Sequence, residues 1–330
     1  MPAGTTFDKT SIHDEGRILR RGADVVPQLM NPVRRSGARI ALAACIAVLT
    51  GCALAGASHS VVDSPPPSLR AQSVTFPSPS GNIIHAWFIA GRPRLGAVLL
   101  LHGMGSNRTS MLGRAEFLHR QGFAVLAPDF QAHGESTGET VTFGARESLD
   151  AAAALAYLRR AAPDERVGVI GVSMGGAATL LGPAPLDVSA VVLESVYPTI
   201  RRAVSDRLAT WFGPFSGVGR LFTSTALGLL RRETGVAETE LQPIAQIGRL
   251  RAPLLLIAGS DDPYTPLAES KSLYAQAPSP KSFWSIEGAG HEDLHAFTPE
   301  QYQWRVGGFL SRLLRRADGE ASTDSTARTP

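Results

Sequence analysis

One serine of this sequence stands in a pattern that is typical of a catalytic nucleophile. Gly-Val-Ser-Met-Gly occupies residues 171–175, directly after the apolar run 167–170 and before an alanine-rich segment at 176–181. Between a strand and a helix, such a Gly-x-Ser-x-Gly turn holds its serine in a strained, exposed position, and the small residues permit the turn. We predict that Ser173 is a nucleophile, and the alternative is an ordinary turn between a strand and a helix.

Candidates for the partners of this serine follow later apolar runs. A serine hydroxyl is a weak nucleophile unless a base takes its proton and a third group orients that base. Asp261 and Asp262 come after one run, and His291 follows the next in a glycine-containing loop. Because open α/β sheets bind ligands at the carboxyl ends of their strands, the order serine, aspartate, histidine predicts a triad with either aspartate as its acid.

Other histidines fit structural roles better. His295 lies four residues after His291, at what reads as a helix start, so we expect it to be structural or to line the pocket. His102 and His133 belong to loop motifs described below. We expect His85 at the surface, and His119 likewise.

Strand and helix patterns alternate along the chain and define the frame that must position these residues. Short, continuous apolar runs suit parallel strands buried on both faces, and the first two segments read as an opening hairpin. We expect strands at 73–76, 82–89, 97–101, 124–127, 167–172, 190–193, 254–258 and 282–286, and helices at 111–121, 145–161, 176–181 and 299–315. This predicts one α/β domain over 71–316 with a mostly parallel, doubly wound sheet of about eight strands. We expect the polar tail 317–330 to be disordered.

Residues 197–250 interrupt the alternation. They lie between two expected strands and are rich in large apolar residues, with several glycines among them. So long an insertion in a compact domain is usually functional, and we expect a helical cap over the strand ends, where a substrate would bind. The alternative is a pair of ordinary packing helices. An apolar cap would favour an uncharged or lipidic acyl group in the substrate.

Three further loop motifs complete a pattern that resembles one superfamily of enzymes. His-Gly-Met-Gly stands at 102–105, Asp-Phe-Gln-Ala-His-Gly-Glu-Ser-Thr-Gly at 129–138, and Gly-Ser-Asp-Asp-Pro-Tyr-Thr-Pro at 259–266. Together with the serine motif, they resemble the α/β-hydrolase superfamily, in particular its bacterial esterase, lipase and serine-aminopeptidase-like branch. The resemblance covers nearly all of the domain and implies the α/β-hydrolase fold.

The resemblance selects Asp262 as the acid, because the Gly-x-x-Asp-x-x-x-Pro loop of the superfamily aligns with it and leaves Asp261 as a loop or capping residue. Glu194, just after the strand 190–193, is a further candidate, since some members of the superfamily place the acid there. The implied triad is Ser173, His291 and Asp262, with an acyl-enzyme mechanism that needs neither a metal nor a cofactor. We expect a hydrolase of carboxylic esters or related acyl bonds. An acyltransferase or a peptidase with the same triad is the alternative, and a non-catalytic binding lipoprotein is a further one.

The same resemblance assigns the oxyanion hole and two supporting loops. The backbone N–H groups of Met104, in the His-Gly-x loop, and of Met174, after the nucleophile, would face the developing negative charge. We expect His102 to brace its loop rather than to transfer protons. The 129–138 loop carries Ala132 where the superfamily has a glycine, and its residues read as structural.

The first residues of the chain read as a leader rather than as part of the fold. Arg34, Arg35 and Arg39 precede the uncharged run 40–49, which is typical of a secretory signal and too short to span a bilayer. Leu-Thr-Gly-Cys at 49–52 resembles the lipobox of bacterial lipoproteins, in which cleavage leaves the cysteine as a lipidated N-terminus.

We therefore expect residues 1–51 to be removed and Cys52 to carry acyl chains such as palmitate, which anchor it in a membrane. Residues 52–70, with their proline run, would tether the domain. Met30 opens a normal n-region, so we expect translation to start there. The protein would then be a lipoprotein of a bacterial cell envelope, facing the periplasm or the exterior, with a small-molecule or lipid acyl compound as its substrate.

Charge argues against nucleic acid as a partner. Residues 1–51 hold seven of the 32 Lys and Arg and four of the 29 Asp and Glu, so they account for the whole formal charge of +3. The rest of the chain has 25 of each and is neutral, with no basic stripe. The sequence carries no signal for an oligomeric state.

Overall fold

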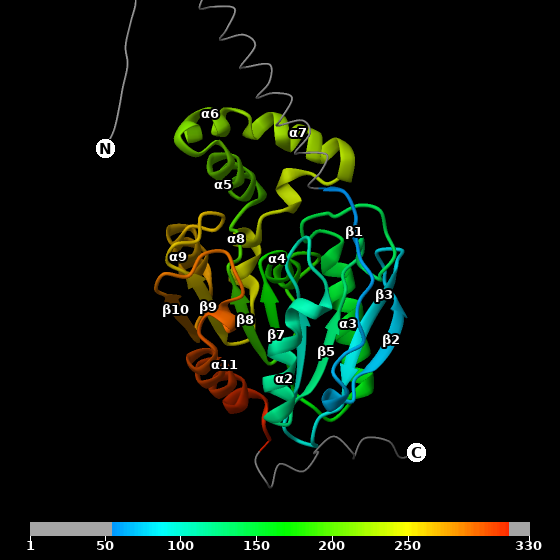
Figure 1. Ribbon diagram of the computed structural model, residues 1–330. Helices are drawn as coiled ribbons and strands as arrows, with labels where there is room; N and C mark the ends of the chain where they lie inside the picture. Colours follow the sequence, from blue (N-terminus) through cyan, green and yellow to red (C-terminus); the bar gives the residue numbers. More distant parts are fainter. Residues whose placement is uncertain (1–54, 317–330) are drawn as a thin grey trace, which may run out of the picture. The chain divides into compact units, whose positions relative to one another are not determined.

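The computed structural model describes residues 55–316 (Figure 1). The leader at 1–51, Met30, Cys52 and the tail 317–330 all lie outside the described residues. Within the described range, one mostly parallel sheet carries helices on both faces. The doubly wound α/β architecture predicted from the sequence is confirmed.

Within residues 55–316 the sheet has eight strands in the order β10-β9-β8-β7-β4-β5-β3-β2. β2 and β3 form the expected antiparallel hairpin, β3 is also antiparallel to β5, and the other neighbours are parallel. β4, β5, β8 and β9 are buried along their whole length, as continuous apolar runs require. The bounds are β2 Gln72–Pro77, β3 Ile83–Ile89, β4 Ala97–Leu101, β5 Ala124–Pro128, β7 Val167–Val172, β8 Ala190–Glu194, β9 Leu254–Gly259 and β10 Lys281–Ile286.

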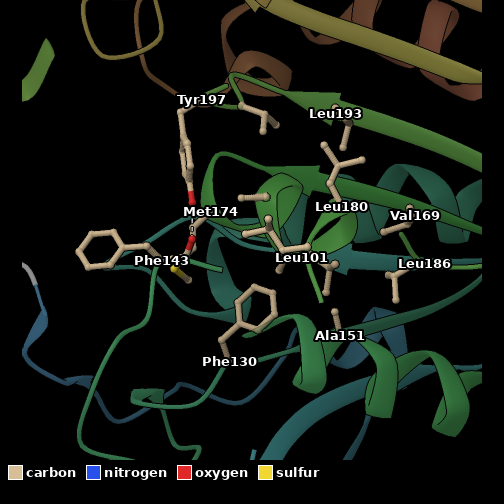
Figure 2. Packing of buried hydrophobic residues seen from close by; sticks show 14 of the residues in the cluster. Leu101, Phe130, Phe143, Ala151, Val169, Met174, Leu180, Leu186, Leu193 and Tyr197 are labelled. Carbon is tan, nitrogen blue, oxygen red and sulfur yellow. Dashed lines mark hydrogen bonds between the residues drawn. The ribbon is translucent and has the colours of Figure 1, made fainter. Parts of the chain in front are cut away.

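Successive side chains of each strand pack on opposite faces of the sheet. Leu99 and Leu101 join an apolar cluster on one face, while Val98 and Leu100 join a cluster on the other. Figure 2 shows part of the first cluster, which includes Met174 directly after the serine turn. The first face is covered by α3 Glu147–Ala161, α4 Met174–Leu180 and α9 Leu267–Gln276, and the second by η2 Arg108–Met111, α2 Leu112–Arg120, α10 Leu294–Phe297 and α11 Pro299–Leu314.

Residues 197–250 form the predicted helical cap. Its three longer helices pack largely on one another, and the rings of Phe212 and Phe222 stack at 6.1 Å. Phe215 and Leu221 remain exposed on its outer surface. Figure 1 shows α5, α6 and α7 beyond one end of the sheet. The elements are α5 Ile200–Phe212, η3 Gly213–Phe215, α6 Ser216–Leu221, α7 Thr223–Thr234, η4 Glu238–Glu240, α8 Pro243–Gln246 and η5 Ile247–Arg249.

The segment that follows the expected anchor is partly bound to the domain. β1 Ser58–His59 pairs in parallel with β6 His133–Gly134, and Ala55 is buried. The tether predicted over 52–70 therefore needs correction over residues 55–60, whose backbone groups bond to a loop of the domain. Strands of two residues contain no apolar run, so the sequence pattern could not predict them. No helix of the described range is long and apolar enough to cross a membrane.

Candidate active site

Ser173 occupies a strained turn between β7 and α4. Its φ of 49° and ψ of −111° lie outside the regions that side-chain-bearing residues favour, and such strain is common at functional sites. The backbone N–H of Ser173 donates to the carbonyl oxygen of Glu194 at 2.8 Å, which fixes the turn to β8. A Cβ on Gly175 would lie 2.3 Å from the carbonyl oxygen of Leu101, so only glycine fits there. The geometry matches that of a nucleophile elbow.

His291 and Asp262 are brought together at the carboxyl ends of β9 and β10. Nδ1 of His291 lies 2.8 Å from Oδ2 of Asp262. The buried carboxylate also accepts hydrogen bonds from the backbone N–H groups of Tyr264 and Thr265, at 2.8 and 2.9 Å, and from the Thr265 hydroxyl at 2.5 Å. Burial opposes ionisation of Asp262, but the bonds from His291 and Thr265 outweigh it and hold its pKa below the ordinary value. The surroundings of Asp262 therefore favour its ionised form in contact with the imidazole of His291.

The other candidates for the acid lie elsewhere. Asp261 is exposed and accepts a hydrogen bond from the Ser260 hydroxyl at 2.9 Å. Glu194 is buried, and its carboxylate bonds to Arg114 at 2.7 Å and to the hydroxyl of Tyr302. The structure thus gives Glu194 a part in a buried ion pair and leaves the contact with His291 to Asp262.

His295 packs between aromatic rings, as its predicted structural role requires. Its ring stacks on Phe117 at 5.3 Å and meets the edge of Tyr302 at 5.1 Å. A Cβ on Gly113 would lie 2.9 Å from Nδ1 of His295, so α2 approaches this ring closely. His295 is a packing residue here.

The loop that carries Met104 lies against the serine turn and is held by two histidines. A Cβ on Gly103 would be 3.6 Å from Cβ of Ser173. His102 is fully buried, and its Nε2 accepts a hydrogen bond from the N–H of Phe130 at 3.0 Å. Nε2 of His133 accepts a bond from the N–H of Gly105 at 3.1 Å. Burial lowers the pKa of His102 to about 3, so it stays neutral and braces the loop.

The 129–138 loop supports this arrangement through a buried charge cluster. Asp129 accepts hydrogen bonds from the backbone and the guanidinium of Arg108, and from the N–H of Glu135 at 3.0 Å. A Cβ on Gly134 would lie 2.1 Å from this carboxylate, which explains the glycine. Ala132 has a φ of 58° at the position where the superfamily has a glycine, so the loop keeps its turn with some backbone strain.

Ser173 and His291 line one cavity of about 350 Å³ between the strand ends and the cap. Met104 lines it too. Met174 begins α4, and its side chain packs into the core near Leu101 and Phe130 (Figure 2).

The sequence interpretation missed several polar residues of the cavity wall, among them Arg114, Ser195 and Arg207. These three belong to no motif, and their side chains reach the cavity only through the packing of α2, β8 and α5. Among residues 55–316, no group of His, Cys, Asp or Glu side chains is arranged to hold a metal ion.

Comparisons with known proteins extend these observations. The model of the family described as "Alpha/beta hydrolase family" matches residues 98–302. The uncharacterized protein YqkD of Bacillus subtilis is 25% identical over 248 residues, which cover 72% of this chain and 78% of YqkD. YfhR of Salmonella typhi, also uncharacterized, is 26% identical over 69% of this chain and 77% of its own length.

Solved structures show the same fold. The esterase Pf2001 of Pyrococcus furiosus is 25% identical, with a TM-score of 0.64, over 77% of this chain and 98% of the esterase. The α/β hydrolase GrgF from Penicillium is 17% identical and superimposes with a TM-score of 0.56, which supports the fold alone.

Proposed function

This chain belongs to the alpha/beta hydrolase family, and from that premise we propose that it is a serine hydrolase that cleaves carboxylic esters. Its nucleophile would be Ser173, its base His291 and its acid Asp262. The observation that carries the proposal is the 2.8 Å contact between His291 and Asp262, because it places an oriented imidazole on the wall of the cavity that Ser173 also lines. The similarity to an esterase of known structure supports the same reaction class.

In the proposed reaction, Nε2 of His291 accepts the hydroxyl proton of Ser173 while Oγ attacks the ester carbonyl. Asp262 stabilises the imidazolium that forms. The imidazolium then donates its proton to the leaving alcohol, and the acyl group stays on Ser173. Water gives a proton to His291 and attacks the acyl carbon. When this second intermediate breaks down, the imidazolium returns the proton to Oγ of Ser173, which releases the acid and restores the serine.

The oxyanion of both tetrahedral intermediates needs two hydrogen-bond donors. The N–H groups of Met104 and Met174 are the proposed donors, because the elbow and the 102–105 loop lie against each other at Gly103. The braces at His102 and His133 would keep the loop N–H groups preorganised, and loss of one such donor typically lowers the rate about 10²–10³-fold.

A fluorophosphonate probe tests this proposal, because it reacts covalently with activated serines. We expect the purified full-length protein to be labelled at Ser173, with Ser173→Ala unlabelled and equally well folded by circular dichroism. Hydrolysis of short p-nitrophenyl esters should follow the same pattern. A folded protein that neither reacts with the probe nor hydrolyses esters would instead support the non-catalytic binding function.

The N-terminal proposal concerns residues before the described range. A lipidated Cys52 would lie only three residues before Ala55, and so within roughly 10 Å of a point that is buried in the domain. The proposed bacterial lipoprotein would then hold its catalytic domain close to the membrane surface of the envelope. Labelling of cells with radioactive palmitate tests this. The Cys52→Ala variant should carry no label and should no longer be recovered in the membrane fraction. Label that persists in Cys52→Ala would contradict it.

A further inference from the structure

Arg207 brings a positive charge into the cavity without an ion-pair partner. It lies on α5 of the cap, half-buried, with its guanidinium 5.2 Å from the centre of the Tyr264 ring. No carboxylate of residues 55–316 lies within ion-pair distance of it, although Asp206 and Asp262 act on it from farther away. Burial lowers the pKa of Arg207, but a guanidinium remains protonated in proteins. Its charge is therefore available to a ligand in the cavity.

The other charged side chains of the cavity wall are already bonded. Arg114 lies 2.7 Å from Glu194 on one side and 2.7 Å from Asp293 on the other. Glu292 accepts a hydrogen bond from the backbone N–H of Gly290 at 3.0 Å. The carboxylates of the wall are thus engaged away from Arg207, and its guanidinium keeps its bonding capacity.

Ser195 supplies a second unsatisfied group on the same wall. The residue follows β8, its N–H donates to the carbonyl oxygen of Ile257 at 3.0 Å, and its φ of 49° is unusual for a serine. Only 3% of the residue is exposed, and its hydroxyl has no hydrogen-bond partner within the described range. A buried hydroxyl without a partner is destabilising, so a ligand oxygen that accepts its proton would be favoured.

From these two groups we infer that the substrate is an ester that carries a carboxylate near its scissile bond. A carboxylate matches the planar guanidinium of Arg207 and can accept a charge-assisted hydrogen bond from it, with a further bond from Ser195. This inference rests on the proposed function and specifies its substrate class.

The apolar residues of the cap do not support the lipidic substrate expected from the sequence. Among the described residues, Arg207 is the cap's contribution to the cavity wall, and none of the large apolar side chains of α5, α6 or α7 lines it. Phe215 and Leu221 are exposed to solvent instead. The cap therefore presents charge to the substrate.

A pair of esters of similar size tests the inference. Monomethyl glutarate carries a carboxylate where methyl hexanoate ends in an ethyl group, and enzymatic detection of methanol follows both reactions. We expect the wild-type protein to favour monomethyl glutarate in kcat/KM by about tenfold or more. Arg207→Gln should lower this ratio about tenfold and Ser195→Ala about threefold, whereas Arg207→Lys should retain part of it.

A matched control removes one positive charge from the same cap. Arg232→Gln, on the exposed face of α7, should leave the ratio unchanged. A wild-type protein without preference for the charged ester, or an unchanged ratio in Arg207→Gln, would overturn the inference, while hydrolysis of methyl hexanoate would keep the proposed function. Failure to hydrolyse either ester, together with no fluorophosphonate labelling, would overturn both.

Discussion

Two buried arginines of the sheet domain are paired with carboxylates, whereas Arg207 of the cap has no carboxylate within ion-pair distance among the described residues. In the domain, Arg108 bonds to Asp129 with almost no exposure of either side chain, and Arg114 bonds to Glu194 in the same way. In each pair the carboxylate compensates the buried arginine charge, and the pair holds a loop or helix of the active site in place. These pairs give the strand-end side of the cavity one fixed arrangement.

The cap side shows the opposite pattern. Among residues 55–316, Arg207 has no carboxylate at ion-pair distance. Asp206 of α5 interacts with Glu269 of α9, so that two carboxyl groups meet where the cap touches the domain, and Glu269 also lies 3.7 Å from the guanidinium of Arg202. An unpaired cation can bind an anionic ligand, and a pair of carboxyl groups can bind a proton. The difference suggests that the domain fixes the chemistry while the cap determines which substrates and conditions suit it.

The largest expected effect on activity comes from a substitution in the sheet domain. Asp262→Asn keeps the size of the side chain but removes the charge that orients and stabilises protonated His291, so we expect kcat for ester hydrolysis to fall about 10⁴-fold. Asp261→Asn, at the exposed neighbour, should change kcat less than about twofold. Equal losses in both variants would contradict the assignment of Asp262 as the acid.

A second effect compares buried and exposed ion pairs. Glu194→Gln leaves Arg114 buried with part of its compensation gone, and we expect the free energy of unfolding to fall by about 3 kcal/mol. Glu238→Gln breaks the exposed pair with Arg201 on the cap and should cost about 0.5 kcal/mol. Urea denaturation measures both.

The same variants separate a structural from a catalytic role of Glu194. The fraction of Glu194→Gln that stays folded should retain far more activity than Asp262→Asn, because Asp262 is the residue in contact with His291. A loss of activity as large as that of Asp262→Asn, in protein shown to be folded, would restore Glu194 as a candidate for the acid.

The sequence predicted those candidate site residues that lie just after the end of a strand. Ser173 comes directly after β7, Asp262 three residues after β9 and His291 five residues after β10, and parallel strands bring such positions to one edge of the sheet. The eight strands could be predicted because apolar patterns mark them. The cap could be predicted because residues 197–250 interrupt the alternation of strands and helices with a long apolar insertion. The assignment of the triad remains a prediction until the variants above are measured.

Residues whose position depends on tertiary packing could not be predicted. Arg207 is one of several arginines on α5, and only the tilt of that helix over the Asp262 loop decides that it lines the cavity. Ser195 owes its place to a strained turn after β8 that no spacing pattern marks. The pairing of β1 with β6 was missed because two-residue strands carry no pattern at all.

The smallest predicted effect concerns the pH dependence of stability at the contact between the cap and the domain. Burial, and next the charge of Asp206, raise the pKa of Glu269 to about 7 from an ordinary value of 4.5. Between these two values the folded protein keeps a proton that the unfolded chain has released, so the contribution of this group to stability falls as pH rises from about 4.5 to 7. Glu269→Gln imitates the protonated form and removes this loss.

We therefore expect Glu269→Gln to be more stable than the wild type at pH 8, by on the order of 1–2 kcal/mol, and to differ little at pH 5. One pKa unit corresponds to about 1.4 kcal/mol, and part of the shift stays with the charge of Asp206. The melting temperature should rise by about 2–4 °C for each kcal/mol. Glu233→Gln, an exposed carboxylate on α7, should follow the wild-type pH profile. If Glu269→Gln gave no gain at pH 8, the two carboxyl groups would not be in conflict, and the contrast between a compensated domain and an open cap would rest on Arg207 alone.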